Sequence, residues 1–341
     1  MRTRTVLRIT GLLAVLAVAG VTLEDNLPDL GQTAHALGSA HPWWLVLAAT
    51  AEMTSLRHFA LQQRRLLAGF GVRMSVPRAV AVSFTRSAIS FSLPAGSAVS
   101  AGYAFRQFRT AGATRRTAGA VAVLSSVLSG VALVLMYGAV VLIPRGGATG
   151  NTDTLVLVLG LLATATLTFA LDWLLTRGPV EPPAEDDAPE PPGAGWIGRG
   201  RAAVRRTLYD LRRLPPRSWV LSLVHATVNW GLDLACLAAT AAAFGIDVSL
   251  VRLATVYLTV QLVRQVPLSP GGIGVVEVAL LAGLVSAGAA QAPAAAAMLV
   301  YRLLSCWIII PVGLLTYAVL RRGTPPEPAP AEPPVLAGQG S

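Results

Sequence analysis

The sequence contains no lysine, and all 27 of its basic residues are arginine. This excludes enzymes that need a lysine amine, such as P-loop nucleotide hydrolases and enzymes that form a Schiff base. Only 13% of the residues are charged, whereas a soluble domain carries about a quarter. The two cysteines and four histidines stand at spacings that fit no metal site, redox pair or disulfide framework. With 54% hydrophobic residues and a formal net charge of +10, the composition indicates a basic integral membrane protein.

Six stretches are long and apolar enough to cross a bilayer, for which a helix needs roughly 20 apolar residues. The first follows three arginines, as a signal peptide does, but it lacks a small-residue cleavage site and further membrane segments follow. We therefore interpret it as a retained helix. The six stretches cover residues 6–23, 42–61, 117–143, 154–176, 218–244 and 293–320.

Two further apolar regions, 77–101 and 250–290, are interrupted by proline and glycine at 93–97 and 267–274. Proline removes a helical hydrogen bond and glycine adds backbone freedom, so neither interruption continues a helix. Backbone groups freed at membrane depth must be buried in protein or line a wet cavity. Both regions therefore predict broken or re-entrant helical hairpins, although the arms of the second are long enough to leave open a full crossing.

Arginine is distributed unevenly over the predicted loops. The loops assigned to the outer side hold a single arginine, Arg145, and the remaining loops and both ends of the chain are arginine-rich. This asymmetry predicts a multi-pass protein of the cell membrane with both termini in the cytoplasm.

The two interrupted regions match one another at a constant offset of 176 residues. Three spans separate the copies, so we expect them to lie inverted in the membrane, as in many transporters. The alternative is that these prolines and glycines only kink packed helices. The matched pairs that carry the argument are Pro94 with Pro270, Gly96 with Gly272, and Trp43 with Trp219.

The sequence therefore predicts an all-α polytopic membrane protein, with about six spanning helices plus two broken hairpins in an inverted internal repeat. One membrane domain covers 1–323, with repeat one at about 1–143 and repeat two at about 154–320. Residues 177–217 join the repeats. They combine an acidic, proline-rich linker with a basic helix suited to an anionic lipid surface rather than to nucleic acid. The proline-rich tail, 324–341, is expected to be disordered.

The segment 267–277 reads Pro-Leu-Ser-Pro-Gly-Gly-Ile-Gly-Val-Val-Glu, and Gly288 and Arg302 follow it. It resembles a signature of the flippase-like family named for the lysylphosphatidylglycerol synthase transmembrane region, the membrane half of the multiple peptide resistance factor. Arg86, Pro94 and Gly96 resemble an earlier half-site, where the family often has an acidic residue after the glycine and this chain has Ser97. The resemblance implies binding or movement of lipids with anionic or aminoacylated headgroups. In full-length relatives aminoacylation belongs to a separate soluble domain, so this chain is expected not to be an enzyme.

Charged side chains within membrane segments are costly unless they are paired or hydrated, so they are the first candidates for a site. Arg86 and Arg264 are predicted to clamp a lipid phosphate, or else to pair with Glu277, Asp233 or Glu52. For Glu277 the alternatives are capping its helix, binding an ammonium headgroup or carrying a proton. Arg302 either pairs internally or contacts the ligand. The remaining candidates for headgroup binding are the turn residues Pro94, Gly96, Pro270, Gly271, Gly272 and Gly274.

Glu52, His225, Asn229 and Asp233 are predicted to form a polar network within the membrane or to line a cavity. No metal, cofactor or nucleic acid is expected. The leading hypothesis is a lipid transporter or flippase with a central cavity. The alternative is a non-transporting membrane partner that presents lipid to a separate synthase or glycosyltransferase. An enzyme acting on polyprenyl-linked sugars is disfavoured, because the phosphate–metal cluster that such chemistry needs is missing.

Overall fold

A computed structural model describes residues 30–93, 96–141, 209, 214–264 and 272–322 of the chain, and these residues are helical, with no strand among them. The predicted spans 6–23 and 154–176, the linker 177–217 except for its last residues, and the tail 324–341 lie outside the described residues. So do three predicted turn residues, Pro94, Pro270 and Gly271.

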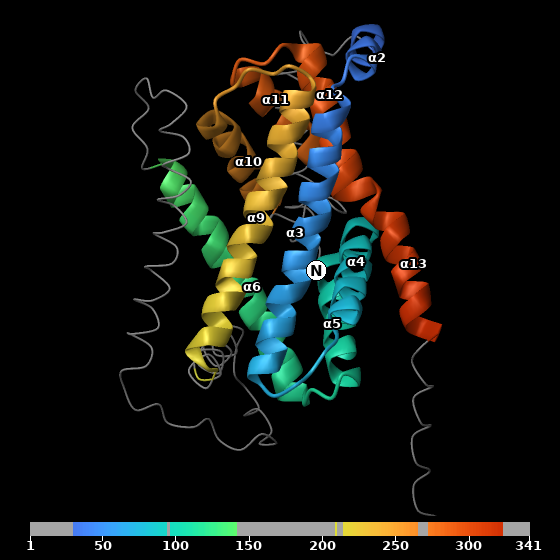
Figure 1. Ribbon diagram of the computed structural model, residues 1–341, viewed down its shortest axis with the longest axis vertical. Helices are drawn as coiled ribbons and strands as arrows, with labels where there is room; N and C mark the ends of the chain where they lie inside the picture. The colour runs from blue at the N-terminus through green and yellow to red at the C-terminus, as the bar shows by residue number, and fades with distance from the viewer. Residues whose placement is uncertain (1–29, 94–95, 142–208, 210–213, 265–271, 323–341) are drawn as a thin grey trace, which may run out of the picture.

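Two 28-residue helices, α3 (Pro42–Gly69) and α9 (Pro216–Ala243), form the centre of the molecule (Figure 1). Both begin with proline in the first turn, where the missing N–H costs no hydrogen bond. Their contacts run antiparallel. The Ser55 hydroxyl donates to the backbone oxygen of Asn229 at 2.9 Å, and the Ser222 hydroxyl donates to that of Gln62 at 3.3 Å. The residue numbers of the contact partners on α9 therefore decrease as those on α3 increase, as they do between antiparallel helices.

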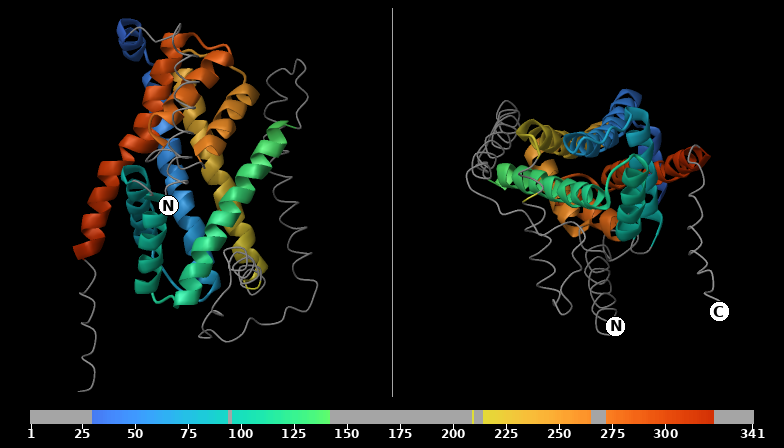
Figure 2. Two further views of the ribbon diagram at one scale, coloured as in Figure 1. Left: turned by 180° about the vertical axis from the view of Figure 1, so that it is seen from behind. Right: turned by 90° about the horizontal axis from the view of Figure 1, so that it is seen from below.

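Each predicted interruption separates two short helices. α4 (Val76–Ser92) and α5 (Gly96–Thr110) pack together, as do α10 (Leu250–Arg264) and α11 (Val275–Ser286). At 1.5 Å per residue all four are shorter than the ~30 Å hydrocarbon layer. Figures 1 and 2 show α4 and α5 toward one end of the molecule and α10 and α11 toward the other.

Described glycines lie beside both interruptions. A Cβ on Gly96 would lie 2.5 Å from the Ser90 carbonyl oxygen, so a larger residue would separate α4 from α5. Gly272 has a φ of 70° and Gly274 a φ of 87°, in the left-handed region that glycine enters without strain.

Three helical stretches are long and apolar enough to cross a membrane: Arg115–Val140 in α6 (Arg115–Val141), Pro216–Ala243, and the continuous run Gln291–Arg322. They correspond to the predicted spans 117–143, 218–244 and 293–320. The predicted span 42–61 is helical throughout, within α3. α3 is long enough but too polar to be counted with these three apolar stretches. Its polar side chains, Glu52 and Gln62 among them, are buried against neighbouring helices.

The run Gln291–Arg322 consists of α12 (Gln291–Arg302), a π-helical turn η2 (Leu303–Trp307) and α13 (Ile309–Arg322). In the π turn the Ile308 N–H donates to the Leu303 carbonyl at 2.9 Å. Pro311 follows within one turn. Its ring lacks an N–H and clashes with the carbonyl four residues back, and a wider turn relieves that clash. The short helix α2 (Leu30–Gly38) packs on α12.

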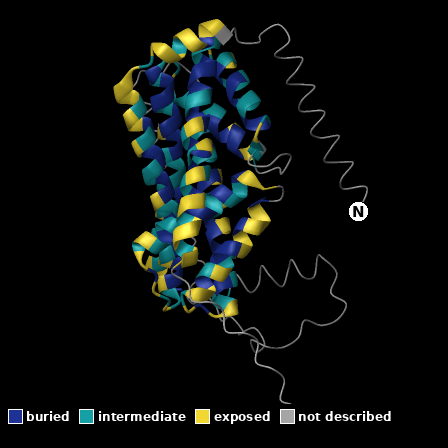
Figure 3. Cartoon of the chain, turned by 90° about the vertical axis from the view of Figure 1, so that its right-hand side faces the viewer, coloured by how far each residue is buried: buried dark blue, intermediate teal, exposed yellow. Residues whose placement is uncertain are grey.

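Large apolar side chains are exposed on the outer faces of the helices, while the inward faces are buried (Figure 3). Leu314, Leu315 and Val319 project from α13, and Val123 and Val127 from α6. An apolar outer face over buried polar groups such as Glu52 and Asp233 is the arrangement that a lipid environment requires.

Helices α4 and α13 approach closely at Gly313, where an added Cβ would lie 2.5 Å from the Phe84 carbonyl oxygen. Replacing Gly313 with valine should lower the free energy of unfolding by about 1–3 kcal/mol, because backbone cannot move aside as a flexible side chain does. The measurement is thermal unfolding of detergent-purified protein. Gly138→Val on α6 is the control, because an added Cβ there meets no described atom within 4 Å. Equal stability of the two variants would contradict the close contact.

Candidate functional site

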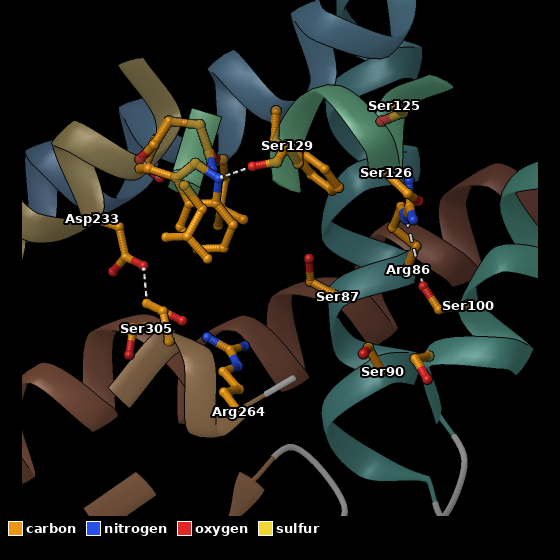
Figure 4. Close-up of a pocket in the computed structure, with 18 of the residues that line it drawn as sticks. Arg86, Ser87, Ser90, Ser100, Ser125, Ser126, Ser129, Asp233, Arg264 and Ser305 are labelled. Atoms are coloured by element: carbon orange, nitrogen blue, oxygen red, sulfur yellow. Dashed lines mark hydrogen bonds between the residues drawn. The ribbon is translucent and has the colours of Figure 1, made fainter. Parts of the chain in front are cut away.

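A cavity of about 570 Å³ lies between the two hairpins and the central helices (Figure 4). Its walls come from α3, α4, α5, α6, α9, α10, η2 and the first residue of α13. Hydroxyl groups dominate its polar lining, and they give adaptable hydrogen bonds without fixed charge. The serines are Ser55, Ser87, Ser90, Ser97, Ser100, Ser125, Ser126, Ser129 and Ser305.

Arg86, on α4, lines the cavity next to α5. Its Nε donates a long hydrogen bond of 3.5 Å to the Ser100 hydroxyl, and its Cζ lies 4.9 Å from the centre of the Phe59 ring. The ring face partly compensates the buried cation. Within the described ranges, no carboxylate forms an ion pair with Arg86.

Arg264, the last residue of α10, reaches the same cavity from the other hairpin, with its Cζ 5.0 Å from the centre of the Phe91 ring. In the view of Figure 4 it lies between Asp233 on one side and Arg86 on the other. Internal pairing with Glu277, Asp233 or Glu52 was the alternative role predicted for Arg264. Among the residues that the structure places, Arg264 forms no ion pair with any of these three carboxylates. Each hairpin thus contributes one guanidinium group to the cavity.

Asp233, on α9, is held by three donors. Its Oδ1 accepts a hydrogen bond from the Tyr301 hydroxyl at 2.8 Å. Its Oδ2 accepts from the Tyr257 hydroxyl at 2.8 Å and from Gln261 Nε2 at 3.1 Å. Only 8% of Asp233 is exposed. These three hydrogen bonds satisfy both acceptor oxygens of a buried carboxyl group.

Glu52, on α3, lies beside Asp233 and is 4% exposed. Its Oε2 is fully buried and has no hydrogen-bond partner in the part of the chain that is described. Both carboxyl groups line the cavity, but among the described residues only Asp233 has donors to both of its carboxylate oxygens.

The other two members of the predicted polar network are placed differently. Asn229 lines the cavity and accepts hydrogen bonds from the Ser55 hydroxyl at both its backbone oxygen and its Oδ1. His225 lies outside the cavity lining, and its Nδ1 is 3.0 Å from Nδ1 of His58 across the α3–α9 contact. Glu52, Asn229 and Asp233 thus gather at one site, whereas His225 belongs to helix packing.

Glu277 and Arg302 form an ion pair, with 2.7 Å between Oε1 and Nε, and neither of them lines the cavity. The Glu277 Oε2 accepts the Gly274 N–H at 2.7 Å, at the start of α11. Arg302 is 1% exposed. This geometry combines two of the predicted alternatives, in which Glu277 caps its helix and Arg302 pairs internally.

A family model described as the lysylphosphatidylglycerol synthase TM region matches residues 8–313. The chain belongs to this family. It is also 39% identical over 72 residues to a UPF0104 membrane protein of Methanothermobacter thermautotrophicus (strain Delta H), and that match covers 21% of each chain. The resemblance inferred from segment 267–277 is therefore confirmed, and the protein is a membrane protein of the lysylphosphatidylglycerol synthase TM family.

In this member of the family, the residues predicted as headgroup ligands fall into two groups. Of the four charged residues, Arg86 and Arg264 line the cavity, whereas the Glu277–Arg302 pair joins the start of α11 to the end of α12. The described turn glycines Gly96, Gly272 and Gly274 do not line the cavity. The sequence alone did not identify Tyr257 and Gln261 as partners of Asp233. Their spacing of four residues places them on one face of α10, and this spacing is the one sequence feature that indicates a shared partner.

Proposed function

We propose that the protein binds a phospholipid or related lipid with a charged headgroup, anionic or aminoacylated, in this cavity and moves it across the membrane. The observation that carries the proposal is the pair of partly buried guanidinium groups, Arg86 and Arg264, which line the cavity and which no described carboxylate neutralises by an ion pair. A guanidinium fork matches the oxygens of a phosphate group, and the surrounding serines supply further hydrogen bonds.

The size of the cavity supports a headgroup ligand. A volume of about 570 Å³ lies within the range of small-molecule sites, roughly 300–1,000 Å³. Two acyl chains do not fit in such a volume together with the headgroup, so they remain among the apolar outer faces of the helices.

The helix order supports an inverted arrangement of two repeats. In each half a long helix precedes a broken hairpin and a second long helical stretch, and α3 and α9 run antiparallel. The hairpins lie toward opposite ends of the molecule (Figure 1). Broken helices that meet between inverted repeats are a recurring basis of alternating access. The positive-inside rule then orients both termini toward the cytoplasm of the cell membrane.

The test is lipid exchange in proteoliposomes that carry fluorescent phosphatidylglycerol in both leaflets. A membrane-impermeant reductant quenches only the outer leaflet of protein-free vesicles, whereas exchange exposes the inner leaflet as well. We expect nearly complete quenching with the protein. Exchange no faster than in empty vesicles, across several lipid classes, would contradict transport. Lipid retained without exchange would favour the second function, in which the protein presents lipid to a separate synthase or transferase.

A further inference from the structure

The carboxyl groups of Glu52 and Asp233 share one wall of the cavity, yet their surroundings differ. Asp233 receives three hydrogen bonds, from Tyr257, Gln261 and Tyr301. Glu52 is equally buried, but its Oε2 has no donor in the described structure. Two adjacent buried carboxylates repel one another, and the Glu52 oxygen without a donor is the better placed of the two groups to accept a proton.

Several elements present charged or titratable groups to Glu52. Two charged groups interact with Glu52 and line the same cavity, the Asp233 carboxylate and the Arg264 guanidinium. Within the described residues, α6 and η2 contribute only serines and apolar side chains to this cavity. The groups that face Glu52 are Asp233 and Cys236 on α9, Tyr257 and Arg264 on α10, Tyr301 on α12 and, across the cavity, Arg86 on α4.

We propose that Glu52 is a proton-binding site, and that its protonation is linked to the binding of an anionic lipid headgroup at Arg264. The inference rests on the proposed function and adds to it the source of energy, an electrochemical proton gradient. No nucleotide is required.

The linkage follows from electrostatics. Without a bound headgroup, the Arg264 guanidinium attracts negative charge on Glu52 in the same cavity. An anionic phosphate bound to Arg264 cancels that effect and adds a second negative charge facing Glu52. Glu52 then takes up a proton from water in the cavity, and the bound lipid and proton together carry no net charge. By reciprocity, protonating Glu52 strengthens the binding of the headgroup.

The direction of the pH dependence is therefore fixed. Lipid binding is strongest at low pH, where Glu52 is protonated, and weakens as the pH rises above the value at which Glu52 titrates. One linked proton changes the apparent dissociation constant by at most about tenfold per pH unit. When the cavity opens to the other side of the membrane, the proton leaves with the lipid, which makes the process a symport.

The experiment measures proton uptake directly. Short-chain phosphatidylglycerol is added to the purified, detergent-solubilised protein in weak buffer, and both binding and the pH change of the solution are recorded. We expect the wild type to take up protons on binding, up to one per bound lipid. The Glu52→Gln variant, which is permanently neutral at this position, should bind the lipid with an affinity that does not depend on pH and should take up no proton.

Asp247→Asn is the matched control, because it removes an exposed carboxylate that does not line the cavity. It should behave as the wild type. Proteoliposomes with an inward or outward pH gradient supply the second readout: the gradient should bias the direction of phosphatidylglycerol movement in the wild type and not in Glu52→Gln.

The outcomes separate the two proposals. If the wild type neither binds nor exchanges phosphatidylglycerol, the proposed function fails. If it binds and exchanges the lipid but Glu52→Gln keeps the proton uptake and the pH dependence, proton coupling at Glu52 is overturned. Coupling is also overturned if replacing sodium with choline removes the gradient response, since the two carboxyl groups then serve a sodium ion.

Discussion

Replacing Glu277 with alanine should reduce the free energy of unfolding by about 3–5 kcal/mol, because it leaves the buried Arg302 guanidinium without its counter-charge. Arg302 is 1% exposed, its Nε lies 2.7 Å from the Glu277 Oε1, and its Nη2 has no partner among the described residues. The same substitution deprives the Gly274 N–H of its acceptor at the start of α11. Chemical unfolding in detergent, followed by circular dichroism, measures the effect.

A double variant provides the control. In Glu277→Gln with Arg302→Met, glutamine keeps an acceptor for the Gly274 N–H and methionine replaces the buried cation with an apolar chain. It should be more stable than Glu277→Ala alone, because no charge is left buried without a partner. If Glu277→Ala unfolds at the same denaturant concentration as the wild type, the pair is not structural and Arg302 is compensated by a ligand or by water.

Replacing both Arg86 and Arg264 with alanine should reduce phosphatidylglycerol exchange to the rate of protein-free vesicles. Removing one cation from a buried, hydrogen-bonded charge pair costs about 2–5 kcal/mol, so each single variant should already lose more than tenfold. Folding should survive, since neither side chain forms an ion pair within the described parts of the chain.

Arg252→Ala is the matched arginine control. Arg252 is exposed, donates to the Ala287 carbonyl at 3.4 Å and does not line the cavity, so its loss should leave exchange unchanged. A double variant of Arg86 and Arg264 that exchanges lipid at the wild-type rate would exclude the cavity as the route of the headgroup. Size-exclusion chromatography must show that each variant is folded.

The helical architecture could be predicted from the sequence because its signals are local. The interruptions at 93–97 and 267–274 follow from proline and glycine, and α4, α5, α10 and α11 end or begin beside them. Spans 117–143, 218–244 and 293–320 follow from continuous apolar runs. The proposed inverted relation of the two halves depends on how the helices cross in space, and a one-dimensional offset does not determine it.

The candidate site could be predicted only in part. The predicted membrane segments contain the charged residues Arg86, Arg264, Glu277 and Arg302, and this marks them as candidates. The free-energy cost of a charge inside the membrane does not indicate which face of a helix the side chain occupies. The structure turns two of them toward the cavity and joins the other two in an ion pair. The difference between Glu52 and Asp233 depends on donors that come from α10 and α12, up to 68 residues away from Asp233 along the chain. Contacts between residues so far apart along the chain cannot be predicted from local sequence patterns.

The central claim is that the cavity holds an anionic headgroup on Arg86 and Arg264. Native mass spectrometry of gently purified protein tests it most directly, because it identifies the lipids retained by each chain. The wild type should retain an anionic or aminoacylated phospholipid, one per chain, that the Arg86→Ala, Arg264→Ala double variant loses while Arg252→Ala keeps it. Retention of the same lipid by all three proteins, or of no charged lipid by the wild type, would contradict the claim.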